Sequence, residues 1–500
     1  MNMKNLMINE NLSWPVRSLN GQLWISLLLG GGATWYTILF WKAQLGLNAL
    51  LFSGFLLLAV WLLYPEMRSA RRIWLAMAGV LLSAVAVVWQ HSLLAQLTHV
   101  VSIFLLLGFA QARELRFLGF ALMLAISSLL TIPLTWWRRW ERQYEAAFRS
   151  LGTWIYLAIL PLCLLGLFFT IYYFANAEFA GLVDLMLSWL PKISPWKSLA
   201  LFLQGLLLIS VLIWSSVWTP EMLEQEQSYS LKKLHKRPSI KAFTPTLALR
   251  RHYYSGVLSF ALLNVLLLVV NITDIKGVWL NQYQHSAAEL SEFVHQGTYL
   301  LIAALALAMG VIAFFFRGNL HFLQKNQSLK TLAYTWIVQN TLLALSVAWR
   351  NYHYIAEYGL AYKRLGVLWF LILVILGLYS LYVMIQERRS LYYLWVVNAW
   401  FLYASLLLTS MVNWDVLITR YNLHQARHAT IDCSFLLQEV SDKNLPLLLN
   451  EHVLLQRRSD LDPHWVDRKL KAKIKRFEQR QAKLDWRGWN WADVKTARVL

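Results

Sequence analysis

The segment between residues 350 and 364 contains the residue types best suited to binding an anion. Its candidate binding residues are Arg350, Tyr354, Glu357, Tyr358 and Arg364. Arg350, Tyr354 and Tyr358 follow an i, i+4, i+8 spacing, so a helix would place them on one face, with Glu357 close to it. The planar guanidinium of Arg suits phosphate or carboxylate, and Glu357 could pair with it or accept a proton. The spacing predicts a polar site for an anionic group.

A second interpretation of this segment needs no ligand. The segment lies between two apolar runs, 331–349 and 365–385. At the edge of a bilayer, Arg side chains extend to the head groups and Tyr rings belong to the interfacial aromatic belt. Under the first interpretation, Arg350→Ala and Arg364→Ala leave membrane insertion intact but abolish the phenotype that deletion produces. Normal complementation by both variants favours the second.

Two other segments have His and acidic residues at helical spacing. The first holds the metal candidates His285, Glu289, Glu292 and His295, within an arc of about 120° on a helix. Such a helix offers only adjacent ligand pairs, and the HExxH pattern is absent, so we expect a polar helix face and no metal or other cofactor. His424, His428 and Asp432 form the second series, which we interpret in the same way.

A polar block, residues 413–422, directly follows the last apolar run. Its candidate contact residues are Asp415, Arg420 and Asn422. If this block lies on the same side of the membrane as residues 350–364, we expect the two to pair. Cysteines replacing Ala361 and Thr419 would then cross-link.

The composition identifies a membrane protein, whose first partner is the lipid bilayer. Of its 500 residues, 58% are hydrophobic and 14% are charged, whereas soluble proteins have about 25% charged residues. Long apolar runs recur from residue 23 to residue 412, and each can cross a bilayer as a helix. The net charge of +20 is dispersed in loops between these runs, which favours cytoplasmic loops over nucleic-acid binding. The sequence leaves open whether the chain also has a partner protein in the membrane or envelope.

We expect an all-α polytopic bundle of about eleven spans with a small helical C-terminal tail. Four regions are expected: a polar arm at 1–22, membrane helices at 23–137, a core membrane domain at 138–412 and a polar, mainly helical tail at 413–500. Counting spans from the basic loops places the tail on the outer side. The charge pattern also requires that one early apolar segment does not cross. We expect 93–110 to be re-entrant or tilted, because its apolar core is short.

Four blocks of sequence resemble an uncharacterised family. They are Ser291–Gly297 (SEFVHQG), Arg350–Arg364, Asn413–Asn422 and Asp485–Asn490. In this order they are similar to a bacterial multi-pass membrane family known as a domain of unknown function, over about residues 140–500. The chain departs from the family at Ala361, His295 and Trp414, where Thr, Arg and Pro are usual. The resemblance implies a bacterial inner-membrane protein and supplies no reaction.

Polar residues within the apolar runs are few. They are Asn264, Asn271, Asp274, Gln339, Asn340 and Asn398. Single amides usually join helices by hydrogen bonds, and we expect Asp274 to be exposed at the interface. His91 and His99 are likewise interpreted as interface residues. The chain lacks the series of carboxylates typical of a proton-driven pump.

These observations favour a non-enzymatic membrane protein in envelope sensing, assembly or signalling. Two alternatives stay open. The first is a permease for a small anionic or lipid-linked solute that uses Arg350, Glu357 and Arg364. The second, weaker one is a membrane enzyme acting on lipid or glycan.

Overall fold

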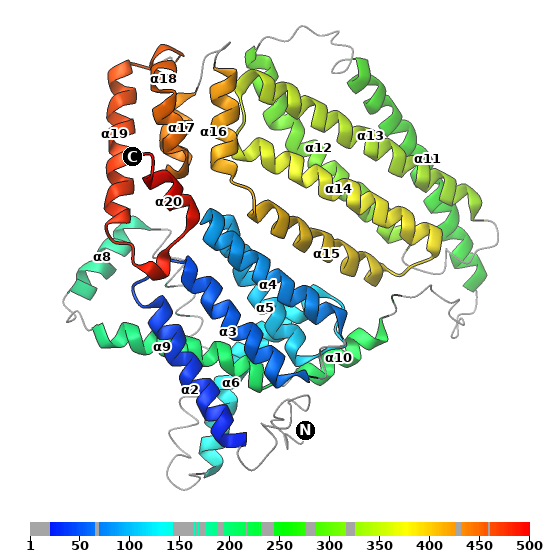
Figure 1. Ribbon diagram of the computed structural model, residues 1–500. Coiled ribbons are helices and arrows are strands. Elements are labelled where there is room, and N and C mark those ends of the chain that lie inside the picture. The colour runs from blue at the N-terminus through cyan, green and yellow to red at the C-terminus, as the bar shows by residue number, and fades with distance from the viewer. Residues whose placement is uncertain are drawn as a thin grey trace.

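A computed structural model describes most of the chain, and the described part is helical (Figure 1). The described residues are 21–65, 70–143, 165, 169, 176–188, 194–216, 218–229, 231, 245–276, 287–316, 326–426, 432–458 and 461–500. The all-α class expected from the sequence is confirmed for these residues. Most of the expected span 151–175 lies outside them.

The first group of helices forms one apolar core. Its members are α2 (Gly21–Phe40), α3 (Leu47–Leu63), α4 (Arg71–Gln90), α5 (Leu93–Gln111), α6 (Leu118–Gln143), α9 (Ser194–Ile213) and α15 (Leu391–Ser410). Their buried side chains meet around Leu56, Val80 and Leu105. The turn between α4 and α5 is only two residues long: His91 adopts the left-handed conformation (φ 47°), and Ser92 caps α5 by accepting a hydrogen bond from the amide of Ala95. Two shorter helices, α8 (Ala177–Ser188) and α10 (Thr219–Ser228), flank α9 in the sequence.

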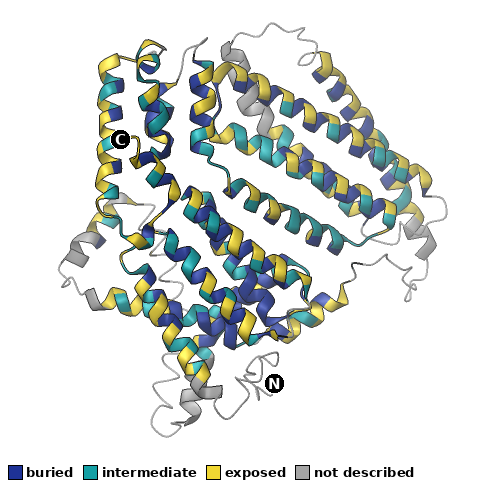
Figure 2. Ribbon diagram, viewed as in Figure 1, coloured by how far each residue is buried: buried dark blue, intermediate teal, exposed yellow. Residues whose placement is uncertain are grey.

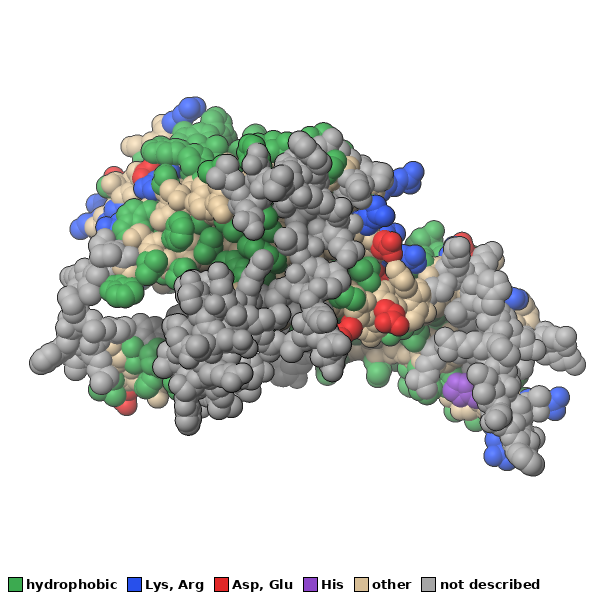
Figure 3. Space-filling view, turned by 90° about the horizontal axis from the view of Figure 1, so that it is seen from below, with side chains coloured by type: hydrophobic (Ala, Val, Ile, Leu, Met, Phe, Trp, Pro, Cys, Tyr) green, Lys and Arg blue, Asp and Glu red, His purple; other side chains and the backbone are tan. Residues whose placement is uncertain are grey.

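The second group packs around a separate apolar core. It consists of α11 (Pro245–Asp274), α12 (Ala287–Phe315), α13 (Gln327–Tyr358) and α14 (Tyr362–Glu387). Helix α15 lies between the groups, because its first residues pack on the second core and Tyr403 packs on the first. Leu258, Leu262 and Val265 of α11 are more than 60% exposed, as suits a lipid-facing surface. Figure 2 shows buried residues concentrated where helices face one another, and the described surface in Figure 3 carries many hydrophobic side chains.

The tail packs as a third core at one end of both groups. It contains α16 (Trp414–Gln425), α17 (Leu445–Asn450), α18 (His452–Arg458), α19 (Pro463–Gln481) and α20 (Trp491–Ala497), with the short helices η4 (Phe435–Glu439), η5 (Asp442–Asn444) and η6 (Trp486–Gly488). Its core includes Ile355 and Leu360 from the end of α13 and the turn after it.

In Figure 1 the tail and α10 lie at opposite ends of the helices. At the α10 end, the buried carboxylate of Glu226 accepts hydrogen bonds from the amides of Arg116 and Phe117 and from the hydroxyl of Tyr392.

Among the described residues, six helices are long and apolar enough to cross a membrane. They are Arg71–Gln90, Leu93–Gln111, Trp196–Ile213, Arg250–Asp274, Tyr362–Glu387 and Leu391–Ser410. Shorter apolar segments occur at Trp24–Phe40, Leu47–Leu63, Leu118–Leu134 and Leu300–Phe315. This protein is therefore membrane-embedded.

The segment expected to be re-entrant, 93–110, belongs to the continuous helix α5. Helix α5 has 19 residues and is long and apolar enough to cross a membrane, so a short apolar core is no longer a reason to expect a re-entrant segment. Helix α6 contacts the ends of two neighbouring helices. Ser128 of α6 donates to the Oε1 of Gln111 at the end of α5 (2.9 Å), and Ser127 contacts Ser216 just after α9 (2.8 Å). The middle of α6 therefore lies beside two helix ends.

His99 is buried among neighbouring helices. It is 4% exposed within α5, and its two ring nitrogens contact the hydroxyls of Ser83 (3.0 Å) and Ser53 (3.4 Å). The apolar run on each side could not reveal that neighbouring helices supply polar partners.

Candidate functional site

The candidate site begins where α13 turns into α14. Helix α13 ends at Tyr358, and Gly359 follows with φ 78°, a left-handed conformation that disfavours a side chain. A Cβ added there would lie 2.7 Å from the Oδ1 of Asn422, so the tail approaches this turn closely. Asn422 accepts from the amide of Leu360 (2.6 Å) and donates to its carbonyl (2.9 Å). Two hydrogen bonds between the side-chain amide of Asn422 and the backbone of Leu360 therefore join α16 to the turn.

Arg364 folds back over the end of α13. Its guanidinium carbon lies 4.2 Å from the ring centre of Tyr354 and 5.9 Å from that of Tyr358. Its Nη1 donates to the carbonyls of Tyr358 (2.8 Å) and Gly359. A cation at a helix C-terminus stabilises carbonyls that have no partner within the helix. Arg364 thus fixes the turn through Nη1 and is itself half-buried.

Arg350 has different partners from Arg364. It forms an ion pair with Asp274 of α11, which also accepts a hydrogen bond from Ser346 (2.8 Å). Asp274 is 8% exposed, so the expectation that it would be exposed is wrong: neighbouring α13 supplies the charge and the hydroxyl that its burial requires. Glu357 is exposed. The structure therefore does not bring the two Arg residues to one anion, nor does it make Glu357 the partner of Arg350.

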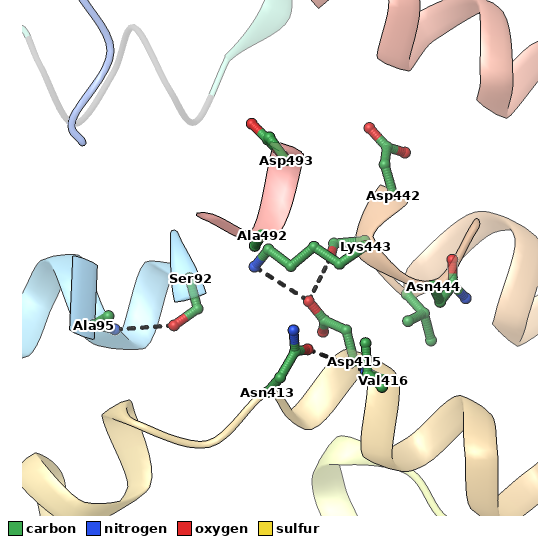
Figure 4. A network of polar contacts seen from close by, with 12 residues as sticks. Ser92, Ala95, Asn413, Asp415, Val416, Asp442, Lys443, Asn444, Ala492 and Asp493 are labelled. Carbon is green, nitrogen blue, oxygen red and sulfur yellow. Dashed lines mark hydrogen bonds and ion pairs between the residues drawn. The ribbon is translucent and has the colours of Figure 1, made fainter. Parts of the chain in front are cut away.

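Asp415 of α16 is the centre of the contact between the tail and α14. It accepts hydrogen bonds from the hydroxyls of Tyr362 and Ser441 and lies 3.3 Å from the Nζ of Lys443. Figure 4 shows Lys443 extending from η5 toward Asp415, with Asp442 and Asp493 nearby. Burial lowers the pKa of Lys443, and the charge of Asp415 opposes that shift. A carboxylate and an ammonium group, both about 90% buried, are thus held against each other at this junction.

The other two expected tail residues behave differently. Asn422 contacts the turn, as described above, whereas Arg420 is exposed on α16. Thr419 is fully buried and accepts from the Nδ2 of Asn444 (3.1 Å), so it suits a cross-link poorly. Gln425 donates to the carbonyl of Ala356, and these two positions are more accessible for a cross-link between the tail and α13.

The tail also contacts the first group of helices. The amide of Leu47 donates to the carbonyl of Trp489 (3.0 Å), and the Nη1 of Arg487 donates to the carbonyl of Ile38 in α2. The rings of Trp89 and Trp491 lie 6.4 Å apart. The tail therefore touches the ends of helices from both groups.

A cleft of about 100 Å³ opens between the α13–α14 turn and the tail. It is lined by Tyr358, Gly359, Leu360, Ala361, Arg364, Asn422, Gln425, Asp432 and Phe435. Three residues expected at a site, Tyr358, Arg364 and Asn422, line this cleft. Arg350 is directed into the helix bundle instead, toward Asp274.

The first metal candidate series cannot be placed. His285 lies outside the described residues, as do the side chains of Glu289, Glu292 and His295. His428 of the second series is also outside them. In the part of the chain whose side chains are described, no three His, Cys, Asp or Glu residues form a group that could hold a metal ion.

Sequence reasoning missed Tyr362, Lys443 and the partner role of Asp274. Tyr362 and Lys443 have no spacing that connects them with Asp415, because α16, η5 and α14 meet only through the tertiary fold. Asp274 did carry a signal, since a carboxylate at the end of an apolar run is costly without a partner.

One comparison with known proteins gave a match. The model of a family described as a domain of unknown function (DUF4153) matches residues 73–451. This range is most of the chain, which therefore belongs to that family. It begins earlier than the resemblance read from the sequence blocks and leaves the block Asp485–Asn490 outside. No curated protein and no solved structure matches the chain.

Proposed function

We propose that this DUF4153 member is a non-enzymatic membrane protein in which the tail senses the relative position of two helix groups, and that it acts in envelope sensing, assembly or signalling. The observation that carries this proposal is the contact of the tail with both groups. Tyr362 of α14 and Leu47 of α3 each bind the tail directly. A shift of one group against the other must therefore strain or release a tail contact.

The chemistry of the junction supports a mechanical role. Arg480 donates to Asp442 and to Asp493, each at 3.0 Å, while Lys443 pairs with Asp415. These charged groups bind one another instead of facing an open cavity. Of these, the Lys443–Asp415 pair is buried, and removing one member of it leaves an uncompensated charge.

The location that fits this proposal is the bacterial inner membrane with the tail outside. The amide of Arg116 donates to Glu226 of α10, Arg72 contacts the carbonyl of Leu115, and Arg389 contacts that of Leu231. Figure 1 shows α10 at the end of the helices opposite the tail. Basic residues concentrate on the cytoplasmic side of membrane proteins. This supports a cytoplasmic position for that end and an outer position for the tail.

The test loosens the junction without removing the tail. Cysteines replacing Ala356 and Gln425, with Cys163 changed to Ser, report docking by their cross-link. Asp415→Ala is expected to reduce the cross-link yield and to abolish complementation of a deletion strain under envelope stress. In Asp415→Ala/Lys443→Met the buried ammonium is also gone, so the tail folds while the link to Tyr362 stays lost. The exposed residue on the same helix, Arg420→Ala, is the matched control.

The outcome decides the proposal. Full complementation by variants that have lost the cross-link would refute it. Protection of the buried thiol of Cys433 from labelling shows that the tail has remained folded in each variant.

A permease for a small anionic or lipid-linked solute is the second candidate, and the cleft beside Arg364 is the observation that favours it. Substrate-dependent uptake into proteoliposomes would support the permease over the sensing role.

A further inference from the structure

The cleft between the α13–α14 turn and the tail presents opposite charges from its two walls. Arg364 belongs to α14, and Asp432 belongs to the tail. Arg364 is half-buried, and no carboxylate pairs with it among the described residues. Asp432 accepts from the amide of Phe435 through Oδ1 (2.9 Å), while the residue itself is exposed. A ligand that fits these walls has a negative and a positive end.

Gln425 adds an acceptor to this cleft. Its Nε2 donates to the carbonyl of Ala356, and its Oε1 is buried with no hydrogen-bond partner in the described part of the chain. A buried acceptor without a donor is costly. The Oε1 of Gln425 and the carboxylate of Asp432 together suit a group with several N–H donors, such as a primary ammonium.

The position of the cleft indicates where its ligand comes from. Arg364 is in the first turn of α14, one of the helices that can cross a membrane. Trp349 and Tyr352 are exposed near the end of α13, and aromatic side chains of this kind mark the level of the lipid head groups. The cleft therefore opens where phospholipid head groups lie.

We propose that this cleft binds the head group of a zwitterionic aminophospholipid. Arg364 binds the phosphate, since its planar donors match phosphate oxygens. Asp432 and the Oε1 of Gln425 accept hydrogen bonds from the primary ammonium. A primary ammonium has three N–H donors for these two acceptors, whereas a trimethylated ammonium has none. The site should thus prefer phosphatidylethanolamine to phosphatidylcholine.

The test measures lipid retention by the full-length chain in nanodiscs with matched amounts of phosphatidylethanolamine, phosphatidylcholine and phosphatidylglycerol. The unaltered chain is expected to retain phosphatidylethanolamine about tenfold over the other two, as one charged hydrogen bond implies. Arg364→Gln should lose retention of phosphatidylethanolamine, and Arg364→Lys should recover part of it. Asp432→Asn keeps a good helix-capping residue but should remove the preference over phosphatidylglycerol. Arg420→Gln, at an exposed position outside the cleft, should change nothing.

Three results would overturn the proposal. They are equal retention of the three lipids by the unaltered chain, an unchanged preference in Asp432→Asn, and full displacement of lipid by free phosphoethanolamine, which would make a soluble compound the ligand.

Discussion

Arg350 and Asp274 form a buried ion pair between α13 and α11, although they lie 76 residues apart in the chain. The pair closes a row of polar contacts along these two helices. Gln339 donates to the Oδ1 of Asn264 (2.8 Å), and Asn271 donates to the carbonyl of Gln339 (3.2 Å). Later residues of α11 contact later residues of α13, so the two helices run parallel. Such contacts join helices where the surrounding lipid offers no apolar driving force for association.

The first prediction concerns this pair. Arg350→Ala leaves a buried carboxylate without its cation, and we expect it to destabilise the protein by about 3–5 kcal/mol. Asp274→Ala leaves the opposite charge and has a similar cost. The double variant should be more stable than the sum of the two losses implies, because no uncompensated charge remains. Thermal unfolding in detergent measures all three, with the exposed Arg420→Ala as the control. Strictly additive losses would contradict the coupling of the two residues.

The second prediction tests the crossing of α5 and α6. A Cβ added to Gly108 would lie 2.0 Å from the backbone oxygen of Ala121, so Gly108→Ala forces the two helices apart. We expect a loss of about 1–3 kcal/mol in unfolding free energy. A Cβ added to Gly54 meets nothing within 4 Å, and Gly54→Ala should be neutral or stabilising because Ala favours a helix. Equal stability of the two variants would rule out the close crossing.

The third prediction concerns pH and the tail. Lys473 is 1% exposed and donates to the carbonyls of Leu436 (3.0 Å) and Val440 (2.7 Å). Burial lowers its pKa from 10.5 to about 8. Between these two values the unfolded tail binds more protons than the folded tail, so stability should rise with pH, by up to about 3 kcal/mol. Below pH 8 this residue contributes no slope.

The labelling rate of the buried Cys433 in urea measures this rise from pH 8 to 10. Lys473→Met should abolish the part of the slope that Lys473 supplies, whereas the exposed Lys475→Met should retain it. A Lys473→Met variant with the full slope would show that another group titrates.

The fourth prediction concerns the sides of the membrane. Reporter domains fused after residues 145, 235 and 450 should give cytoplasmic signals at the first two positions and an outer signal at the third. The reason is that the basic helix ends and the tail lie at opposite ends of the helices. A cytoplasmic signal at 450 would invert the assignment.

The sequence alone determined the helices and the kind of solvent around them. A backbone in lipid must satisfy its own hydrogen bonds, so a long apolar run is a helix whatever its neighbours are. The expected helical face over residues 350–364 is interrupted in the structure, because α13 ends at Tyr358 and Gly359 adopts a positive φ of 78°. Helix spacing correctly placed Tyr354 and Tyr358 on one face, since their rings lie 4.9 Å apart.

Only the tertiary structure decided which side chains meet across helices. Helical spacing suggested Glu357 as the partner of Arg350, but the rotation of α13 against α11 gave that role to Asp274. The same holds for Asp415, whose partners Tyr362 and Lys443 come from α14 and η5. The rotation and offset of packed helices depend on the fit of every side chain between them, and a pattern within one helix does not contain that fit.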